Sequence, residues 1–267
     1  STWSGDCSEN GSVTLGLGEN KTCEITNDDI APKLHLRKVV IIDNGGTATT
    51  ADFTLTANGT GSNDLSGTSP VDSSLSLKAD TFALSETSLA GYNASDWVCN
   101  GGTQNDSNIS LGLAQEATCT ITNDDIAPSL TIIKEVNNDN GGTAKNTDWT
   151  LYANGPTSIS GAGGTTSGST FNAGTYVLGE STGPQFYTGS DWSCTGTGTQ
   201  DHNSISLALG QSAVCRITNS DQPGHLIVHK VTSPTDTTTP FTINANGGTV
   251  LGNATQNILG GGTVNYS

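Results

Sequence analysis

The chain has 267 residues, of which 32% are hydrophobic and 13% are charged, and Gly, Ser, Thr and Asn dominate the remainder. Its net charge of −16 would repel a phosphate backbone, so nucleic acid is excluded as a partner. No apolar stretch approaches the roughly 20 residues of a membrane span, and no segment has the pattern of a signal peptide. We therefore expect no membrane insertion, and either a mature chain or a section of a longer one.

The sequence is built from a repeat. Cys23, Cys119 and Cys215 recur at a constant spacing of 96 residues, and the string TCEITNDDIAP recurs as TCTITNDDIAP and then as VCRITNSDQPG. These strings divide the chain into four segments. They are the last third of a repeat at 1–32, whole repeats at 33–128 and 129–224, and the first part of another repeat at 225–267.

The two partial repeats have two interpretations. They are either the visible ends of a longer array, or two parts that complete each other between subunits by strand donation. Together they lack the stretch that matches residues 76–94. This gap favours a window on a longer array.

Every element expected within a repeat is a β-strand. In the first whole repeat a strand covers 33–43, an Asn-Gly-Gly turn follows, and a second strand covers 51–58. A Gly/Ser-rich stretch leads to a strand at 81–86, and the last strands lie within 108–123. No segment shows a sustained helical period. About seven short strands per repeat predict an all-β protein of tandem immunoglobulin-like or prealbumin-like β-sandwich domains. Short linkers that contain Pro would join them in a linear array.

Each C-terminal part of a repeat carries one pair of cysteines. Two such ligands cannot complete a tetrahedral zinc site, and no Cys-x-x-Cys redox motif occurs. We therefore predict three local disulfides between late strands, and a location outside the cytosol. Free buried thiols are the alternative. The predicted pairs are Cys7 with Cys23, Cys99 with Cys119, and Cys194 with Cys215.

Three polar side chains in each whole repeat are expected to face the core. Because strand side chains alternate between the two faces, Lys38 falls on the same face as Leu34 and Leu36. By the same alternation, the apolar faces of later strands carry one Glu and one Asn. The two sets are Lys38, Glu86 and Asn123 in the first whole repeat, and Lys134, Glu180 and Asn219 in the second.

Burial of these groups is costly unless they pair. One solution is a buried Lys–Glu pair with hydrogen bonds to the Asn. The other solution is covalent, because a desolvated lysine amine is a nucleophile and a protonated Glu can polarise the Asn amide and transfer protons. A Lys–Asn isopeptide bond then forms and ammonia leaves. Such a reaction turns over once, so we do not expect an enzyme.

The segment YVLGESTGPQFY, at 176–187, resembles the Tyr-x-Leu-x-Glu box of the collagen-adhesin B-type, prealbumin-like domains, and FALSETSLAGY, at 82–92, is a weaker match. Domains of that family build pilin shafts and adhesin stalks in Gram-positive bacteria. The family places its reactive Lys in the first strand and its Asn in the last. The pairs Lys134 and Asn219, and Lys38 and Asn123, match that order. Paired cysteines are not part of the family's usual pattern, so disulfides are an alternative to the isopeptide bond as the internal crosslink.

Carboxylates gather at the domain junctions and in the first hairpin of each repeat. Asp124, Asp125 and Asp139 are candidate ligands for a Ca²⁺ ion that would stiffen a hinge. The alternative is a solvated turn in which Asn and Asp side chains cap the backbone. The third copy of the motif, NSD, has lost one Asp, which favours the solvated turn. We expect no cofactor.

These features predict a structural section of an extracellular, cell-surface filament, which is a pilus-like fibre or an adhesin stalk. Its partners would be neighbouring repeats or copies of itself. The alternative is an adhesin that binds a host or matrix surface through its variable loops, at 59–80 and 155–174. Small side chains dominate both loops, which favours the shaft.

Overall fold

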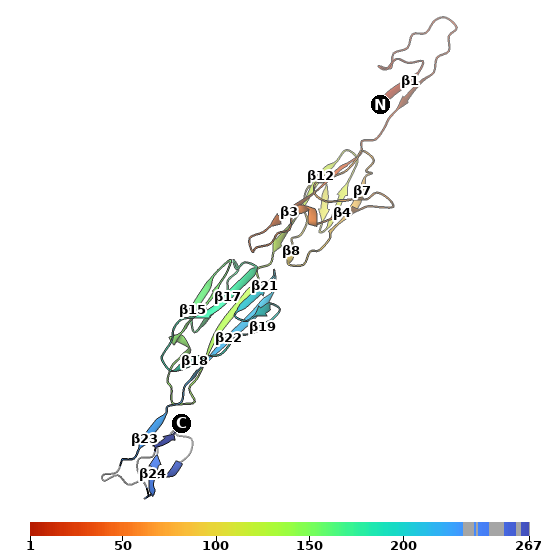
Figure 1. Cartoon of the computed structure of the whole chain (residues 1–267). Coiled ribbons are helices and arrows are strands. Elements are labelled where there is room, and N and C mark those ends of the chain that lie inside the picture. The colour runs from red at the N-terminus through yellow and green to blue at the C-terminus, as the bar shows by residue number, and fades with distance from the viewer. Residues whose placement is uncertain (232–237, 239, 246–253, 260–262, 267) are drawn as a thin grey trace. The chain divides into compact units, whose positions relative to one another are not determined.

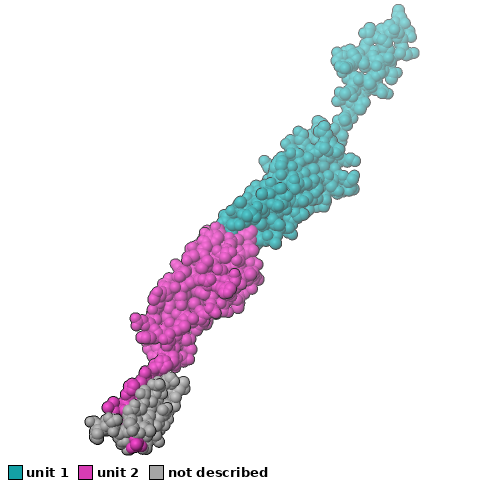
Figure 2. All heavy atoms as spheres, in the orientation of Figure 1, with its two compact units in different colours: residues 1–126 teal, residues 127–267 magenta. Residues whose placement is uncertain are grey.

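The computed structural model describes residues 1–231, 238, 240–245, 254–259 and 263–266 (Figure 1). The other residues all belong to the expected partial repeat at 225–267, so much of that prediction lies outside the described residues. The chain divides into two compact units, residues 1–126 and 127–267 (Figure 2). The finer repeat boundaries stay predictions. In the part of the chain described, no helix is long and apolar enough to cross a membrane.

Unit 1 begins with an antiparallel hairpin of β1 (Thr2–Gly5) and β2 (Cys23–Thr26). A sandwich of two five-stranded sheets follows. One sheet has the order β6-β3-β12-β8, with β9 also paired to β12, and the other has the order β10-β11-β7-β4-β5. The bounds are β3 Lys33–Ile41, η1 Thr50–Asp52, β4 Leu55–Asn58, β5 Leu65–Gly67, β6 Val71–Asp72, β7 Asp80–Glu86, β8 Tyr92–Ala94, β9 Val98–Gly101, β10 Thr103–Asn105, β11 Asn108–Leu111 and β12 Glu116–Asp125.

Unit 2 repeats this sandwich. One sheet has the order β16-β13-β22-β18, with β19 also paired to β22, and the other has the order β15-β14-β17-β21-β20. Two short pairs follow, β23 with β26 and β24 with β25. The bounds are β13 Ser129–Asn137, η2 Asn146–Asp148, β14 Thr150–Asn154, β15 Ile159–Ala162, β16 Gly164–Thr166, β17 Gly174–Glu180, β18 Tyr187–Gly189, β19 Ser193–Gly196, β20 Thr199–Asp201, β21 Ser204–Leu207, β22 Ser212–Asp221, β23 Leu226–His229, β24 Pro240–Ala245, β25 Ala254–Leu259 and β26 Thr263–Tyr266.

The tandem all-β sandwich expected from the sequence is confirmed, but each whole repeat holds ten strands rather than about seven. The additional strands, such as β6 and β8, are two to four residues long. Strands of that length contain too few residues for the alternation of apolar and polar side chains to be recognised.

The first and last strands of each repeat lie side by side and run parallel (Figure 1). In the first repeat, Lys33 on β3 lies opposite Glu116 on β12, and the pairing continues to Ile41 opposite Asp124. Strand β13 pairs with β22 in the same way. The two segments most distant in the sequence of a repeat are therefore neighbours in one sheet.

Each sandwich buries its own apolar core between the two sheets. Leu36 on β3, Leu55 on β4 and Phe82 on β7 are fully buried in the first repeat. Burial of one such side chain stabilises a fold by about 1.5–3 kcal/mol. The polar side chains considered next lie at the edge of this core.

Candidate crosslinking site

A buried lysine lies on the first strand of each whole repeat. In the first repeat the Lys38 side chain is completely buried, and its Nζ lies 2.5 Å from Glu86 Oε2. The Phe53 ring packs under the amine, with 4.3 Å between Nζ and the ring centroid. Burial lowers the pKa of Lys38, and the hydrogen bond to Glu86 offsets part of that effect. A lowered pKa increases the fraction of neutral, nucleophilic amine.

The second repeat reproduces this arrangement with different side chains. Lys134 Nζ lies 2.8 Å from Glu180 Oε2 and 4.8 Å from the centroid of the Trp149 ring. Burial again lowers the pKa of this lysine, with Glu180 acting against it. The separation is that of an ion pair, although neither Lys134 Nζ nor Glu180 Oε2 makes a well-directed hydrogen bond.

The asparagine of each set lies on the strand beside the lysine. Ile121 of β12 is opposite Lys38, so Asn123 lies two residues further along β12, on the same face. Asn219 holds the same position relative to Lys134 on β13 and β22. Both asparagines are buried, and the side-chain oxygen of each lacks a hydrogen-bond partner. Buried polar atoms of this kind are uncommon in folded proteins and call for an explanation.

The two repeats differ in how the Glu contacts the Asn. Asn219 Nδ2 donates a 3.0 Å hydrogen bond to Glu180 Oε1, so this Glu contacts both of the other members of its set. The sequence did not single out Gly189, which lies opposite Asn219 on β18. A Cβ at position 189 would lie 2.9 Å from Asn219 Oδ1 and 3.0 Å from Glu180 Oε1, so a glycine leaves room for the set. The matching residue in the first repeat is Ala94.

This arrangement has the parts that an isopeptide bond requires. The amine can attack the Asn side-chain carbon, the Glu can carry a proton from the amine to the leaving nitrogen, and ammonia departs. Both lysine side chains are completely buried, whereas the side chains of Glu86 and Glu180 are 8% and 20% exposed. The Lys–Asn bonds themselves stay a prediction, as does the alternative of an ordinary buried Lys–Glu pair.

Three disulfides lie in the part of the chain that the structure describes. They are Cys7–Cys23, Cys99–Cys119 and Cys194–Cys215. In both whole repeats the bonded cysteines lie directly opposite each other, on β9 and β12 or on β19 and β22. Trp97 and Trp192 belong to the same core clusters as these cysteines. A loop of about 20 residues closed in this way adds about 3 kcal/mol in the chain-entropy model.

The second Asp of the linker motif binds the first hairpin of its own repeat. The buried Asp125 carboxylate accepts hydrogen bonds from the backbone N–H groups of Asp43, Asn44 and Gly46. In the second repeat Asp221 accepts from Asn140 and Gly142. The matching residue Tyr92 or Tyr187 accepts a further backbone N–H through its hydroxyl oxygen, from Ala48 or Ala144. In both repeats this carboxylate caps the backbone of the hairpin. It is buried, whereas the turn interpretation expects it to be solvated.

The candidate calcium ligands are brought together only in part. The carboxylates of Asp43, Asp124 and Asp125 offer oxygen atoms within 4.8 Å of one another. Asp139, in the other unit, instead accepts hydrogen bonds from Asn137 and Asn140. Calcium binding by Asp124 and Asp125 stays the less favoured alternative to a turn that caps the backbone.

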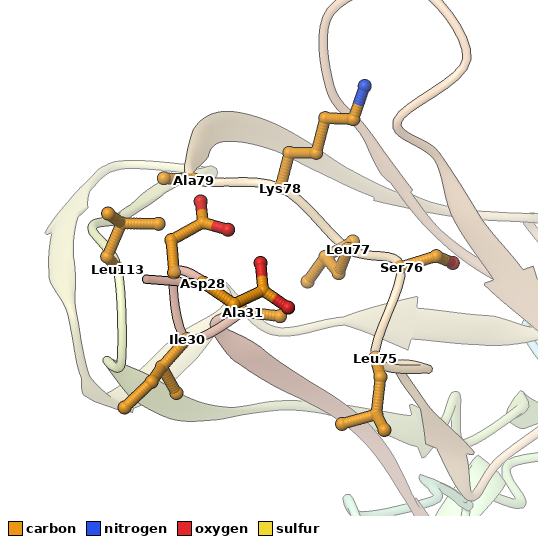
Figure 3. Close-up of a pocket in the computed structure, with 10 residues that line it drawn as sticks. Asp28, Ile30, Ala31, Leu75, Ser76, Leu77, Lys78, Ala79 and Leu113 are labelled. Atoms are coloured by element: carbon orange, nitrogen blue, oxygen red, sulfur yellow. The ribbon is translucent and has the colours of Figure 1, made fainter. Parts of the chain in front are cut away.

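The linker that precedes the first whole repeat packs onto that repeat. The N–H of Ala114 donates a 2.8 Å hydrogen bond to the carbonyl of Ile30, and Pro32 is buried. Beside this contact lies a surface hollow of about 680 Å³, with Ile30, Leu75 and Leu113 at its edge (Figure 3). Its carboxylates come from Asp28 and Asp29.

The chain matches the family model of a prealbumin-like fold domain twice, over residues 29–121 and 125–217. The two matches cover more than half of the chain, and the chain belongs to this family of prealbumin-like domains. The membership that the Glu-box resemblance implied is confirmed. No curated protein sequence matches the chain.

Several solved structures are similar to parts of the chain. The chain is similar to the Bacillus anthracis TIE protein, with a TM-score of 0.51 and 14% identity over 92% of this chain and 46% of that one. It is also similar to the T-13 major pilin from Streptococcus pyogenes, with a TM-score of 0.35 and 11% identity over 74% of this chain and 98% of the pilin. A C-terminal fragment of the pilus adhesin SpaC from Lactobacillus rhamnosus GG gives a TM-score of 0.38 and 10% identity over 74% and 99% of the two chains. At 14% identity the likeness to the TIE protein establishes the fold alone, and the chain spans about half of the TIE protein's length.

Proposed function

We propose that the chain is a structural section of an extracellular filament or adhesin stalk, and that its repeats carry tension. The observation that supports this proposal is the parallel pairing of the first and last strands in both whole repeats. A pull on a repeat enters at the start of β3 and leaves at the end of β12. Because these two ends lie at opposite ends of one parallel ladder, the pull loads its nine residue pairs in shear, and the hydrogen bonds resist together.

The buried Lys and Asn lie on this same pair of strands. A bond between Lys38 and Asn123 would join β3 to β12 covalently, and the force would bypass the chain between them. A bond between Lys134 and Asn219 would do the same for β13 and β22. The lowered pKa of both lysines and the unpartnered oxygens of both asparagines support these crosslinks.

Disulfides and composition support the setting of this function. Three disulfides are typical of proteins outside the reducing cytosol, and a net charge of −16 keeps an extended surface soluble. We propose that the section has no enzymatic turnover, and that its partners are neighbouring repeats or copies of itself in a fibre.

Intact mass of the full chain, measured before and after reduction, tests the crosslinks. We expect a mass that is short of the sequence by one ammonia per whole repeat and stays short after reduction. Asn123→Ala and Asn219→Ala should each remove one ammonia from this deficit. A wild-type mass that changes only by the two hydrogens gained per reduced disulfide would eliminate the isopeptide bonds.

Force spectroscopy of the same chain tests the mechanical function itself. Repeats that are crosslinked between first and last strands should not lengthen under load, whereas the double Asn→Ala chain should unfold in discrete steps at high force. The comparison is with the force that separates the strands of a sandwich one at a time. If the double variant unfolds at forces no higher than that, the shear argument is contradicted.

A further inference from the structure

A second feature of the molecule lies outside the tension-bearing strands. At the end of the second whole repeat, the turn at 140–142, the loop before β18 and the chain after β22 surround a hollow of about 750 Å³. Sites for small molecules in proteins usually have volumes of about 300–1,000 Å³. The hollow is therefore large enough for one or two sugar rings.

Phe186 at the rim of this hollow is exposed and has an unfavourable backbone conformation. The residue is 72% exposed, and its φ of 66° lies in the left-handed region that favours glycine. The first repeat has Gly91 at the matching position, with a φ of 86°. A strained residue of this kind that persists is a reason to look for a function.

The backbone role of this position does not need the aromatic ring. The carbonyl of Phe186 accepts a 2.8 Å hydrogen bond from the N–H of Gln222, and the carbonyl of Gly91 accepts a 2.9 Å hydrogen bond from the N–H of Ile126. Glycine therefore makes the same turn without strain. The ring adds only an exposed apolar face beside the hollow.

Two exposed amides, Gln185 and Gln222, line the hollow together with the exposed imidazole of His225. Gln222 Nε2 donates a 2.7 Å hydrogen bond to Thr188 Oγ1, so the part of this amide that a ligand hydroxyl group would meet is its side-chain oxygen, an acceptor. The Asp221 carboxylate also lines it, but Asn140 and Gly142 already donate hydrogen bonds to its oxygens. A cation would therefore meet an occupied carboxylate, and an anion would be repelled by the chain's net charge.

We propose that this hollow binds a neutral saccharide, whose ring stacks on Phe186 and whose hydroxyl groups bond to the amides of Gln185 and Gln222. A pyranose presents an apolar face of C–H groups and a rim of hydroxyl groups, which matches an exposed aromatic face bordered by amides. Of the two whole repeats, only the second carries the site, because the first has Gly91 and Ile126 in place of Phe186 and Gln222. The filament would then bind glycans through one kind of repeat.

Saturation-transfer NMR on the full chain tests this proposal, with lactose, maltose, cellobiose and N,N′-diacetylchitobiose as probes at about 10 mM, a concentration suited to weak binding. We expect at least one of these sugars to bind, and Phe186→Gly to weaken that binding at least tenfold. Gln185→Ala and Gln222→Ala should weaken it as well. Leu75→Ala, which removes another exposed apolar side chain in the other unit, should leave it unchanged.

Three outcomes would overturn the proposal. They are the absence of binding by all four sugars, binding that persists in Phe186→Gly, and binding that both Gln variants leave intact. Thermal unfolding supplies an independent check, because glycine suits a positive φ and the melting temperature of Phe186→Gly should stay equal or rise. A clear fall would mean that the ring packs against protein, and it would overturn the stacking site too.

Discussion

The backbone N–H of Gly142 donates a 2.7 Å hydrogen bond to the carboxylate of Asp221, although the two residues are 79 positions apart. A Cβ at position 142 would lie 2.8 Å from Asp221 Oδ2 and 2.1 Å from the Tyr187 hydroxyl. The first repeat holds Gly46 against Asp125 in the same way, with Tyr92 beside them. The contact closes each sandwich at the end where its last strand leaves, so the first hairpin and the last strand depend on each other.

Substitution of this glycine should destabilise the second repeat. Gly142→Ala forces the Tyr187 hydroxyl and the Asp221 carboxylate apart, and we expect a loss of about 1–3 kcal/mol in the free energy of unfolding. Denaturant titration of the full chain measures it. Gly168→Ala is the matched control in the same unit, because its Cβ would meet open space and its φ is not positive. Equal effects at both positions would mean that the contact with Tyr187 and Asp221 does not explain the result.

Acid should weaken the same contact. Burial alone would raise the pKa of Asp221, but the hydrogen bonds from Gly142 and Asn140 outweigh it and hold the pKa below the ordinary value of 3.8. A carboxyl group whose pKa is lower in the folded state stabilises the fold above its unfolded pKa and loses that effect as the pH falls. The melting temperature should therefore fall below about pH 4, and Asp221→Asn should flatten this dependence while lowering the melting temperature at pH 7 by about 4 °C or more. An unchanged pH profile in Asp221→Asn would contradict this.

Asp43 should have the opposite pH dependence. Loss of solvent and the nearby charge of Asp124 raise its pKa, so its ionised form opposes folding at neutral pH. We expect Asp43→Asn to raise the melting temperature at pH 7 and to have little effect at pH 3, where the native carboxyl is already protonated. Asp64→Asn, an exposed Asp of the same unit, is the control.

Added Ca²⁺ distinguishes a metal site from a backbone-capping turn at the cluster of Asp43, Asp124 and Asp125. Asp125 already accepts three backbone N–H groups, so we expect added Ca²⁺ to leave the melting temperature unchanged. A Ca²⁺-dependent rise that Asp43→Asn abolishes would instead establish a metal site in the first repeat.

The glutamates should be needed for the Lys–Asn bonds. Glu180→Gln keeps the shape of the side chain but cannot accept the lysine proton, so the deficit of one ammonia should disappear for the second repeat. Intact mass measures this after correction for the substitution. Glu135→Gln, on the exposed face of the same lysine strand, should keep the deficit. Crosslinking that proceeds fully in Glu180→Gln would exclude a role for this carboxylate in the reaction.

Removal of one disulfide should cost stability without loss of the fold. We expect Cys194→Ser with Cys215→Ser to lower the free energy of unfolding by about 3 kcal/mol, because the unfolded chain regains the entropy of an open loop. Thermal unfolding with and without reductant measures it. The double variant should be insensitive to reductant in its second repeat, and a fully reductant-sensitive second repeat would contradict the assignment.

Much of the candidate site could be predicted from the sequence, because its signals are local and periodic. Alternation of side chains along single strands is enough to place Lys134 with the apolar face of the first strand and Asn219 with that of the last. The spacing of 96 residues then separates the repeated features from the incidental ones, and the recurrence of one cysteine pair in each repeat predicts the disulfide between Cys194 and Cys215.

Only the tertiary structure decided which of these groups meet. The contact of Asp221 with Gly142 exists because the last strand closes in parallel on the first, and no local pattern in the sequence encodes that closure. The left-handed backbone of Phe186 could not be predicted either, because the sequence there indicates a loop but does not fix the φ of a single residue. Side-chain alternation is fixed by the geometry of one extended strand, whereas these contacts depend on the pairing of strands about 80 residues apart.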